Sequence, residues 1–248
     1  MYKRQVQPLA YFEGGVPGYL AVLERPGDVL VRVDTLGVCG SDIHYYTAGR
    51  IGGQVIEHPA TLGHECAGTV AEVGAGVDRL AKGQRVAIDP AISCGDCDQC
   101  RAGRAHTCRD LQFLGCPGQA PGAAAEYITI DAGSCYPIPD SMTMVQAALV
   151  EPLSVAIHAR RLAGLQPGSA VGILGAGPIG LCTLLSVRAL GPCRAFVTAL
   201  LENRLGLAKR CGADWTGVPT RGDAVADILQ EETGGLDCVF ECAGEQAA

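Results

Sequence analysis

The chain has 248 residues, 48% of them apolar, enough to build a core in one large domain or two ordinary ones. Its net charge is −7 at pH 7 with no lysine and arginine run, which argues against nucleic acid or an anionic membrane as partner, and no apolar run approaches the roughly 20 residues of a membrane span. The first residues show no secretory signal, so the odd number of cysteines, 13, indicates reduced thiols in a cytoplasmic protein, some of them on metal.

The first half of the chain is typical of a β domain. Short stretches rich in β-branched residues are separated by glycine and proline; they lie at residues 29–39, 67–74, 84–88 and 125–130. Their spacing and the turns between them predict a compact β-barrel-like domain over residues 6–150.

After Glu151 strands alternate with helices. A buried strand, a glycine turn and a helix occupy residues 169–191, and a second strand follows at residues 194–200. The remaining expected elements are a helix closed by Gly212, a strand, a helix and a strand, at residues 202–212, 213–218, 223–235 and 236–244. This alternation predicts a right-handed parallel α/β sheet.

The glycine turn "GAGPIG" places Gly175, Gly177 and Gly180 at the spacing of dinucleotide-binding loops. The first glycine makes the tight turn, the second lets the backbone approach a pyrophosphate, and the third lets helix and strand pack closely. The N-terminus of the following helix supplies N–H donors for the phosphates. The motif alone is weak, but its position between a strand and a helix predicts nucleotide binding.

The end of the second expected strand bears on the choice between NAD and NADP. Ala199 stands where an acidic residue normally holds the adenosine ribose. Glu202 lies three residues further on and is an alternative ribose partner, whereas Arg204 is a candidate contact for a 2′-phosphate. The sequence leaves the two cofactors about equally favoured. Ile179 in the glycine turn, with Ala199 and Arg204, lines the expected cofactor path.

A cysteine-rich stretch at residues 94–108 has the pattern C-x2-C-x2-C-x7-C. Four thiolates so spaced can close a tetrahedral zinc site with no open position; they are Cys94, Cys97, Cys100 and Cys108. An iron–sulfur cluster is the rival interpretation, but the spacing differs from the common ferredoxin runs. We therefore expect a structural zinc that orders a loop, with His106 an exposed bystander.

These motifs converge on one family. "GHECAGTVAEVG" (residues 63–74), "CGSDIH" (residues 39–44), the four-cysteine stretch and "GAGPIG" resemble the zinc-dependent medium-chain alcohol dehydrogenase family. "CGSDIHYYTAGRIG" and "EPLSVAIHA" are most similar to its sorbitol, or polyol, dehydrogenase branch. The resemblance implies a fold of mixed class, α/β and β. A GroES-like β-barrel catalytic domain (residues 6–150) precedes a partial Rossmann doubly wound parallel sheet (residues 151–248).

The resemblance also implies two zinc ions per subunit and NAD or NADP as cofactor. The residues implied at the catalytic zinc are Cys39, His64 and Glu65 as ligands, with Glu151 near the metal holding a water or the substrate. A thiolate, an imidazole and a carboxylate suit Zn²⁺, and an exchangeable position suits catalysis. Cys66 is expected to be a small buried thiol.

The same resemblance assigns roles within residues 39–46. Ser41 and then His44 carry the alcohol proton to solvent. Tyr45 matches a substrate-contacting tyrosine of the polyol branch, with a packed aromatic as the alternative. Asp42 is expected to order the turn or cap the following helix, and His158 is expected to be structural.

The implied reaction is oxidation of a secondary alcohol of a polyol, of the sorbitol or xylitol type, to a ketose with hydride transfer to NAD(P). The implied protein is a cytoplasmic homo-oligomer, a dimer or tetramer. Within the class, an L-threonine or 2,3-butanediol dehydrogenase is the alternative. A non-catalytic nucleotide-binding protein or zinc-stabilised scaffold is remote, because it would be expected to lose one of the four residues around the catalytic zinc.

The two ends of the chain suggest that it is not a complete natural protein. Met1–Gln5 resemble a translated sequencing-library adapter, and we leave them out of the fold prediction. The chain stops at Ala248, soon after an expected buried strand, which predicts a fragment of a longer protein. Because a half-finished parallel sheet exposes its edge and faces, we expect the fragment to bind cofactor weakly and to aggregate.

Overall fold

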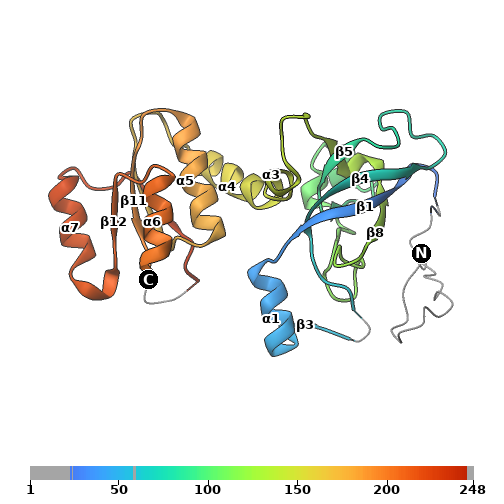
Figure 1. The fold of residues 1–248 in the computed structure, drawn as a ribbon. Helices are drawn as coiled ribbons and strands as arrows, with labels where there is room; N and C mark the ends of the chain where they lie inside the picture. Colours follow the sequence, from blue (N-terminus) through green and yellow to red (C-terminus); the bar gives the residue numbers. More distant parts are fainter. Residues whose placement is uncertain (1–22, 24, 58–59, 245–248) are drawn as a thin grey trace. The chain divides into compact units, whose positions relative to one another are not determined.

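The structure, a computed structural model, describes residue 23 and residues 25–57 and 60–244. The described residues up to Glu151 form one compact unit and those from Pro152 a second (Figure 1). The adapter-like stretch Met1–Gln5 lies outside the described residues. Over the described ranges, no helix is both long and apolar enough to cross a membrane.

The first unit is built on a five-stranded antiparallel sheet. In spatial order its strands are β8 (Tyr127–Asp131), β1 (Asp28–Gly37), β4 (Glu65–Val73), β5 (Arg85–Ile88) and β9 (Cys135–Pro137). The four stretches predicted as strands in this half correspond to β1, β4, β5 and β8. Side chains alternate along β1, so Val29 and Val31 are fully buried in the core while Arg32 is exposed.

The unit has further helices and short strands outside this sheet. They are α1 (Gly40–Ala48), β2 (Arg50–Ile51), β3 (Gln54–Val55), β6 (Ala91–Ile92), α2 (Asp98–Arg101), η1 (Ala105–Thr107), β7 (Gln112–Phe113), η2 (Ala132–Ser134), α3 (Met144–Ala148) and α4 (Val150–Leu162), which continues past the unit boundary. Strands of two residues are too short for a periodic pattern, so the sequence does not predict them.

The second unit is a four-stranded parallel sheet, as predicted. Its order is β12 (Trp215–Gly217), β11 (Arg194–Thr198), β10 (Ala170–Leu174) and β13 (Cys238–Glu241). Its helical segments are α5 (Pro178–Leu190), α6 (Glu202–Arg210), η3 (Pro219–Arg221) and α7 (Ala224–Glu231).

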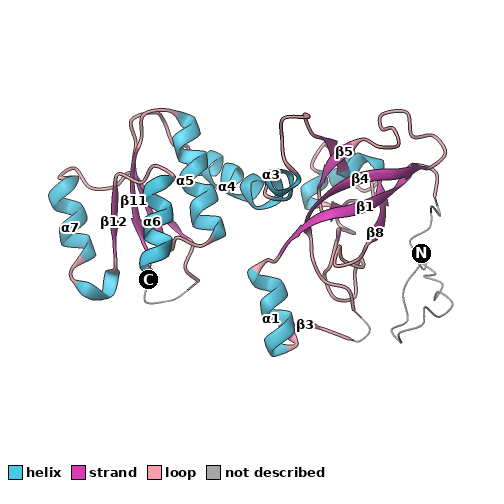
Figure 2. Ribbon diagram, in the orientation of Figure 1, coloured by secondary structure: helices cyan, strands magenta, loops and turns pink. Residues whose placement is uncertain are grey.

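Helices cover both faces of this parallel sheet (Figure 2). On one face Val197 of β11 packs in a cluster with Leu184 of α5 and Leu205 of α6. On the other face Phe196, the preceding residue, packs with Ile228 of α7. Because adjacent strand residues point to opposite faces and both faces are covered, the three central residues of β11, Ala195 to Val197, are all apolar and buried. The predicted doubly wound architecture is confirmed.

Candidate functional site

Three of the predicted metal ligands lie together where β1 and β4 pair. Cys39 follows β1, His64 precedes β4, and Glu65 is its first residue. The antiparallel register sets Gly37 opposite Glu65, which brings the ends of the two strands together. The ligand atoms of Cys39, His64 and Glu65 all lie within 4.8 Å of one another, and both His64 and Glu65 are buried. The donor set of one thiol, one imidazole and one carboxylate fits zinc with a position open to an exchangeable ligand.

The imidazole of His64 and the thiol of Cys39 favour each other's charged forms. The side-chain hydrogen bond with His64 lowers the pKa of Cys39, against the opposing effect of burial. The same hydrogen bond raises the pKa of His64, again against burial. Cys39 is thereby disposed to carry the thiolate that a zinc ion needs. The neighbouring Cys66 has no such partner, and burial raises its pKa to about 12, as expected for a buried structural thiol.

The carboxylate of Asp42 contacts the chain at or beside two of the metal ligands, Cys39 and His64. One carboxylate oxygen, Oδ2, accepts a hydrogen bond from the backbone N–H of Cys39 at 3.0 Å. The other, Oδ1, accepts from the backbone N–H of Gly63 at 3.2 Å and lies 3.8 Å from His64 Nδ1. Cys39 is the N-cap of α1, so Asp42 lies in the first helical turn. The sequence predicts its role in the turn, but the link to a segment 21 residues away is visible only in the fold.

Two further residues shape this group, and sequence reasoning missed both. A Cβ atom at Gly37 would overlap the Glu65 carboxylate, so the glycine leaves space for that ligand. The ring of Phe113 in β7 meets the ring of His64 edge-on, with centroids 5.3 Å apart at 61°. Gly37 stands two residues before the predicted ligand Cys39, and this closeness in sequence could have identified it. Phe113 lies far from the ligands in sequence, so no sequence signal pointed to it.

Gly37→Ala is expected to weaken zinc binding at this group by about 10- to 100-fold, the usual effect of disturbing the surroundings of a ligand. The added methyl group displaces the Glu65 carboxylate. Zinc affinity is measured by competition with a chelator. Gly40→Ala is the matched control, since a Cβ at Gly40 meets no atom within 4 Å. Equal affinities for the two variants would contradict this role of Gly37.

The other predicted residues of this region lie along α1. Ser41 is half-buried and hydrogen bonds to the Cys39 thiol, an interaction that helps to lower the pKa of Cys39. His44 follows by three residues on the same helical face and is exposed to solvent. Tyr45 is only 5% exposed, and its hydroxyl donates to Gln54 Oε1 at 2.9 Å. Burial is the main reason that the pKa of Tyr45 rises to about 12.

Glu151 lies at the start of α4 and is not part of the three-residue group. Burial raises the pKa of its carboxyl group, while the charge of His64 opposes that shift and the charge of Glu65 adds to it. These electrostatic interactions indicate that Glu151 lies near the same ligands. Its contact with a metal-held water or substrate stays a prediction, as does the substrate contact of Tyr45.

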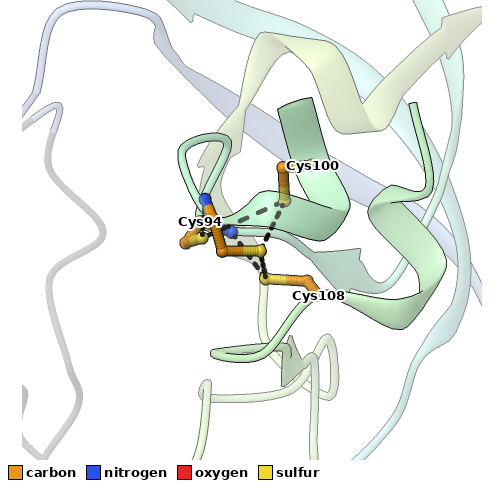
Figure 3. Close-up of side chains that lie close together, drawn as sticks. Cys94, Cys100 and Cys108 are labelled. Atoms are coloured by element: carbon orange, nitrogen blue, oxygen red, sulfur yellow. Dashed lines mark hydrogen bonds between the residues drawn. The ribbon is translucent and has the colours of Figure 1, made fainter. Parts of the chain in front are cut away.

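The four cysteines of residues 94–108 converge in a separate lobe (Figure 3). Their sulfur–sulfur distances are 3.5 Å for Cys97 to Cys100, 3.9 Å for Cys97 to Cys108 and 4.0 Å for Cys94 to Cys100. A tetrahedral zinc with bonds of about 2.3 Å requires a separation of about 3.8 Å. A disulfide requires about 2.05 Å, and all of these cysteines are free. The lobe therefore has the geometry of a closed four-thiolate zinc site.

Backbone N–H groups in the lobe point at the sulfur atoms. The Cys94 and Asp110 N–H groups donate to Cys108 Sγ at 3.2 and 3.4 Å. The N–H of Arg109 is the main reason that the pKa of Cys97 falls to about 6. Such donors stabilise thiolates, the form that binds zinc. His106 is exposed in η1 and is not a member of the cysteine group, as expected.

The glycine turn of the second unit has the predicted geometry. Gly175 has a φ of 98°, and its N–H donates to Thr198 O at 2.9 Å, which joins the turn to the end of β11. A Cβ at Gly180 would overlap the carbonyl oxygen of Gly175, so this third glycine permits the close packing of α5 on the turn. Gly177 is the N-cap of α5, and Ile179 in its first turn is 38% exposed. This open helix N-terminus fits a dinucleotide pyrophosphate.

The matches to known proteins agree with these geometries. Residues 25–140 match the family described as alcohol dehydrogenase GroES-like domain, and residues 178–248 match that described as zinc-binding dehydrogenase. A sorbitol dehydrogenase of Bacillus subtilis is 44% identical over 222 residues, 89% of this chain and 63% of that protein. An L-idonate 5-dehydrogenase of Vitis vinifera is 39% identical over 224 residues, 88% of this chain and 61% of that protein.

A protein of Sinorhizobium meliloti 1021 solved with bound NADP has a similar fold. Its TM-score is 0.83 and its identity 36%, with 93% of this chain and 67% of that chain covered. Fold and matches together place the chain in the class of the zinc-binding dehydrogenases. The chain belongs to the zinc-dependent medium-chain alcohol dehydrogenase family, as its motifs predicted. It spans about three fifths of the length of the curated relatives, 63% and 61%.

Proposed function

We propose that this protein oxidises a secondary alcohol of a polyol to a ketose and transfers the hydride to NAD(P). The convergence of Cys39, His64 and Glu65 at an open metal position carries the proposal. The names of two relatives, sorbitol dehydrogenase and L-idonate 5-dehydrogenase, support a polyhydroxylated substrate. Zinc at this group would supply a Lewis acid that lowers the pKa of the substrate hydroxyl, and the nicotinamide would accept the hydride.

In the proposed reaction the residues of α1 move the proton. Ser41 Oγ accepts the proton of the substrate hydroxyl and passes its own to His44, one helical turn further on. His44 is exposed and releases the proton to water, since imidazole exchanges protons readily near neutral pH. The half-buried location of Ser41 beside Cys39 and the exposed location of His44 support this direction of transfer.

Glu151 and Tyr45 are proposed to hold the substrate. The charge interactions of Glu151 with His64 and Glu65 support a carboxyl group at the metal, where it would accept a hydrogen bond from a water or from a neighbouring substrate hydroxyl. Tyr45 would present its ring and hydroxyl beside the group. Because its hydroxyl already donates to Gln54, its phenol oxygen remains an acceptor for a substrate hydroxyl.

We further propose the domain organisation, the cellular location and the oligomeric state of the protein. Residues 6–150 would form the catalytic domain and residues 151–248 the nucleotide domain, with a structural zinc at the four cysteines. The free state of all 13 cysteines supports a reducing, cytoplasmic location. A homo-oligomer, dimer or tetramer, is proposed from the family alone.

The test is an assay of the zinc-loaded protein with sorbitol, xylitol, L-threonine and 2,3-butanediol as separate substrates, following the reduction of NAD and NADP. We expect the polyols to have the highest kcat/KM. Ser41→Ala should lower kcat by about 10²- to 10⁴-fold, the usual contribution of a positioned proton acceptor, with bound zinc unchanged. A higher kcat/KM for threonine or butanediol, or a Ser41→Ala variant with full kcat, would refute the assignment.

A further inference from the structure

We infer that the nucleotide site of this protein selects NADP over NAD, through the 2′-phosphate of its adenosine half. The inference rests on the proposed nucleotide binding and settles a choice that the sequence leaves open. Three features of the second unit carry it: the end of β11, the ion pair of Glu202, and the position of Arg204.

The end of β11 offers no carboxylate to a ribose. β11 ends at Thr198, whose carbonyl accepts from Gly175 of the glycine turn, so the next residue lies where the adenosine ribose of a dinucleotide is read. That residue is Ala199, which is buried, and the two that follow are leucines that are 63% and 53% exposed. An NAD-selective site uses an acid here to accept from the 2′-hydroxyl, and that acid repels a 2′-phosphate. Neither effect operates in this chain.

Glu202, the nearest acid in sequence, is engaged elsewhere. Its carboxylate forms an ion pair with Arg221 of η3. Both side chains line a hollow of about 430 Å³ between α6, β12 and the start of α7, and neither Ala199 nor Gly177 lines it. The pair neutralises the charge of Glu202 and directs its carboxylate toward η3. Glu202 therefore does not replace the missing ribose acceptor.

Arg204 instead directs a cation at the glycine turn. Its Nη1 atom lies 3.6 Å from the position of a Cβ at Gly177, the glycine that a dinucleotide phosphate approaches most closely. The side chain is exposed, and within the described residues it forms no ion pair. An unpaired guanidinium beside the turn, on a residue five positions after Ala199, can reach a 2′-phosphate, which it binds through charge-assisted hydrogen bonds.

The test measures binding rather than turnover. The dissociation constants of the purified chain for NADP and NAD are determined by calorimetry, and those of NADPH and NADH by energy transfer from Trp215, the single tryptophan. A charge-assisted bond to one phosphate corresponds to about 10- to 100-fold in affinity. We expect NADP to bind tighter than NAD by this factor, and the advantage to shrink as salt is raised because the site is exposed.

Three variants sharpen the measurement. Arg204→Ala is expected to abolish the NADP advantage and leave NAD affinity unchanged. Arg210→Ala, the matched control at the other end of α6, removes the same charge and is expected to keep the advantage. Ala199→Asp is expected to reverse the preference. Equal or tighter binding of NAD to the original protein, absence of binding by both cofactors, or loss of the preference in Arg210→Ala would overturn the inference.

The outcome is separable from that of the polyol assay. If the protein binds NADP more tightly than NAD but does not oxidise polyols, the proposed reaction is wrong and the cofactor inference stands. If it oxidises polyols but binds NAD more tightly than NADP, the cofactor inference is wrong and the proposed reaction stands.

Discussion

His64→Ala is expected to remove the zinc held by Cys39, His64 and Glu65 and to leave the zinc of the four-cysteine lobe in place. The three ligands form one compact group, separate from the cysteine group, so the total falls from two zinc ions per chain to one. Loss of a Lewis acid costs several kcal/mol, so polyol turnover should fall by roughly 10³-fold or more.

The same variant has a second expected result that does not depend on turnover. The hydrogen bond from His64 is the main cause of the lowered pKa of Cys39, so removing the imidazole should raise that pKa. In metal-free protein near neutral pH, less thiolate is then present and alkylation of Cys39 slows. Mass spectrometry of the labelled residue gives the rate.

His106→Ala is the matched control, because it removes an imidazole from an exposed position outside both ligand groups. It should keep both zinc ions, full turnover and the original reactivity of Cys39. A His64→Ala protein that retains both zinc ions and most of its turnover would show that the catalytic metal is held elsewhere.

Removing zinc from the four-cysteine lobe is expected to unfold the lobe. Among residues 94–108 only Cys108 is buried, so the segment has no apolar core of its own. Structural zinc contributes on the order of 10 kcal/mol to the folding of such small segments. In Cys100→Ser we therefore expect trypsin to cut after Arg101 and Arg104 at least about 100-fold faster than in the original protein.

The rest of the first unit should persist in Cys100→Ser, because its core cluster lies on the main sheet and contains no residue of the lobe. Its residual zinc, one ion per chain, should still be lost on adding His64→Ala. Cys238→Ser is the control, since this half-buried cysteine belongs to neither ligand group. Unchanged proteolysis of the lobe in Cys100→Ser would show that protein contacts, and not the metal, order it.

Much of the architecture could be read from the sequence because its signals are local. The apolar runs of the second half and the glycines between them predicted a parallel sheet with helices, and β10 to β13 form it. Glycine spacing also predicted the turn at residues 175–180, where a Cβ at Gly175 or at Gly180 would overlap neighbouring backbone atoms. The four-cysteine spacing works in the same way, since one short loop holds every ligand.

The remaining site features depend on contacts between distant segments. Gly37 makes room for Glu65 only because β1 and β4 pair in one register. Asp42 joins Cys39 to Gly63 only because α1 folds back against the start of β4. The spacing of residue types along one sequence does not predict contacts between segments so far apart in the chain.

The sequence by itself determined the family, the β domain followed by a parallel α/β sheet, the four-cysteine group and the glycine turn, because these follow from residue types in local patterns. The ligands Cys39, His64 and Glu65 came from the resemblance to the family. Only the tertiary structure decided which polar side chains form hydrogen bonds or ion pairs with each other. Tyr45 donates to Gln54, and Glu202 pairs with Arg221 while Arg204 faces the glycine turn. A hydrogen bond or an ion pair depends on distances of a few ångströms, and folding sets those distances between residues that the chain keeps apart.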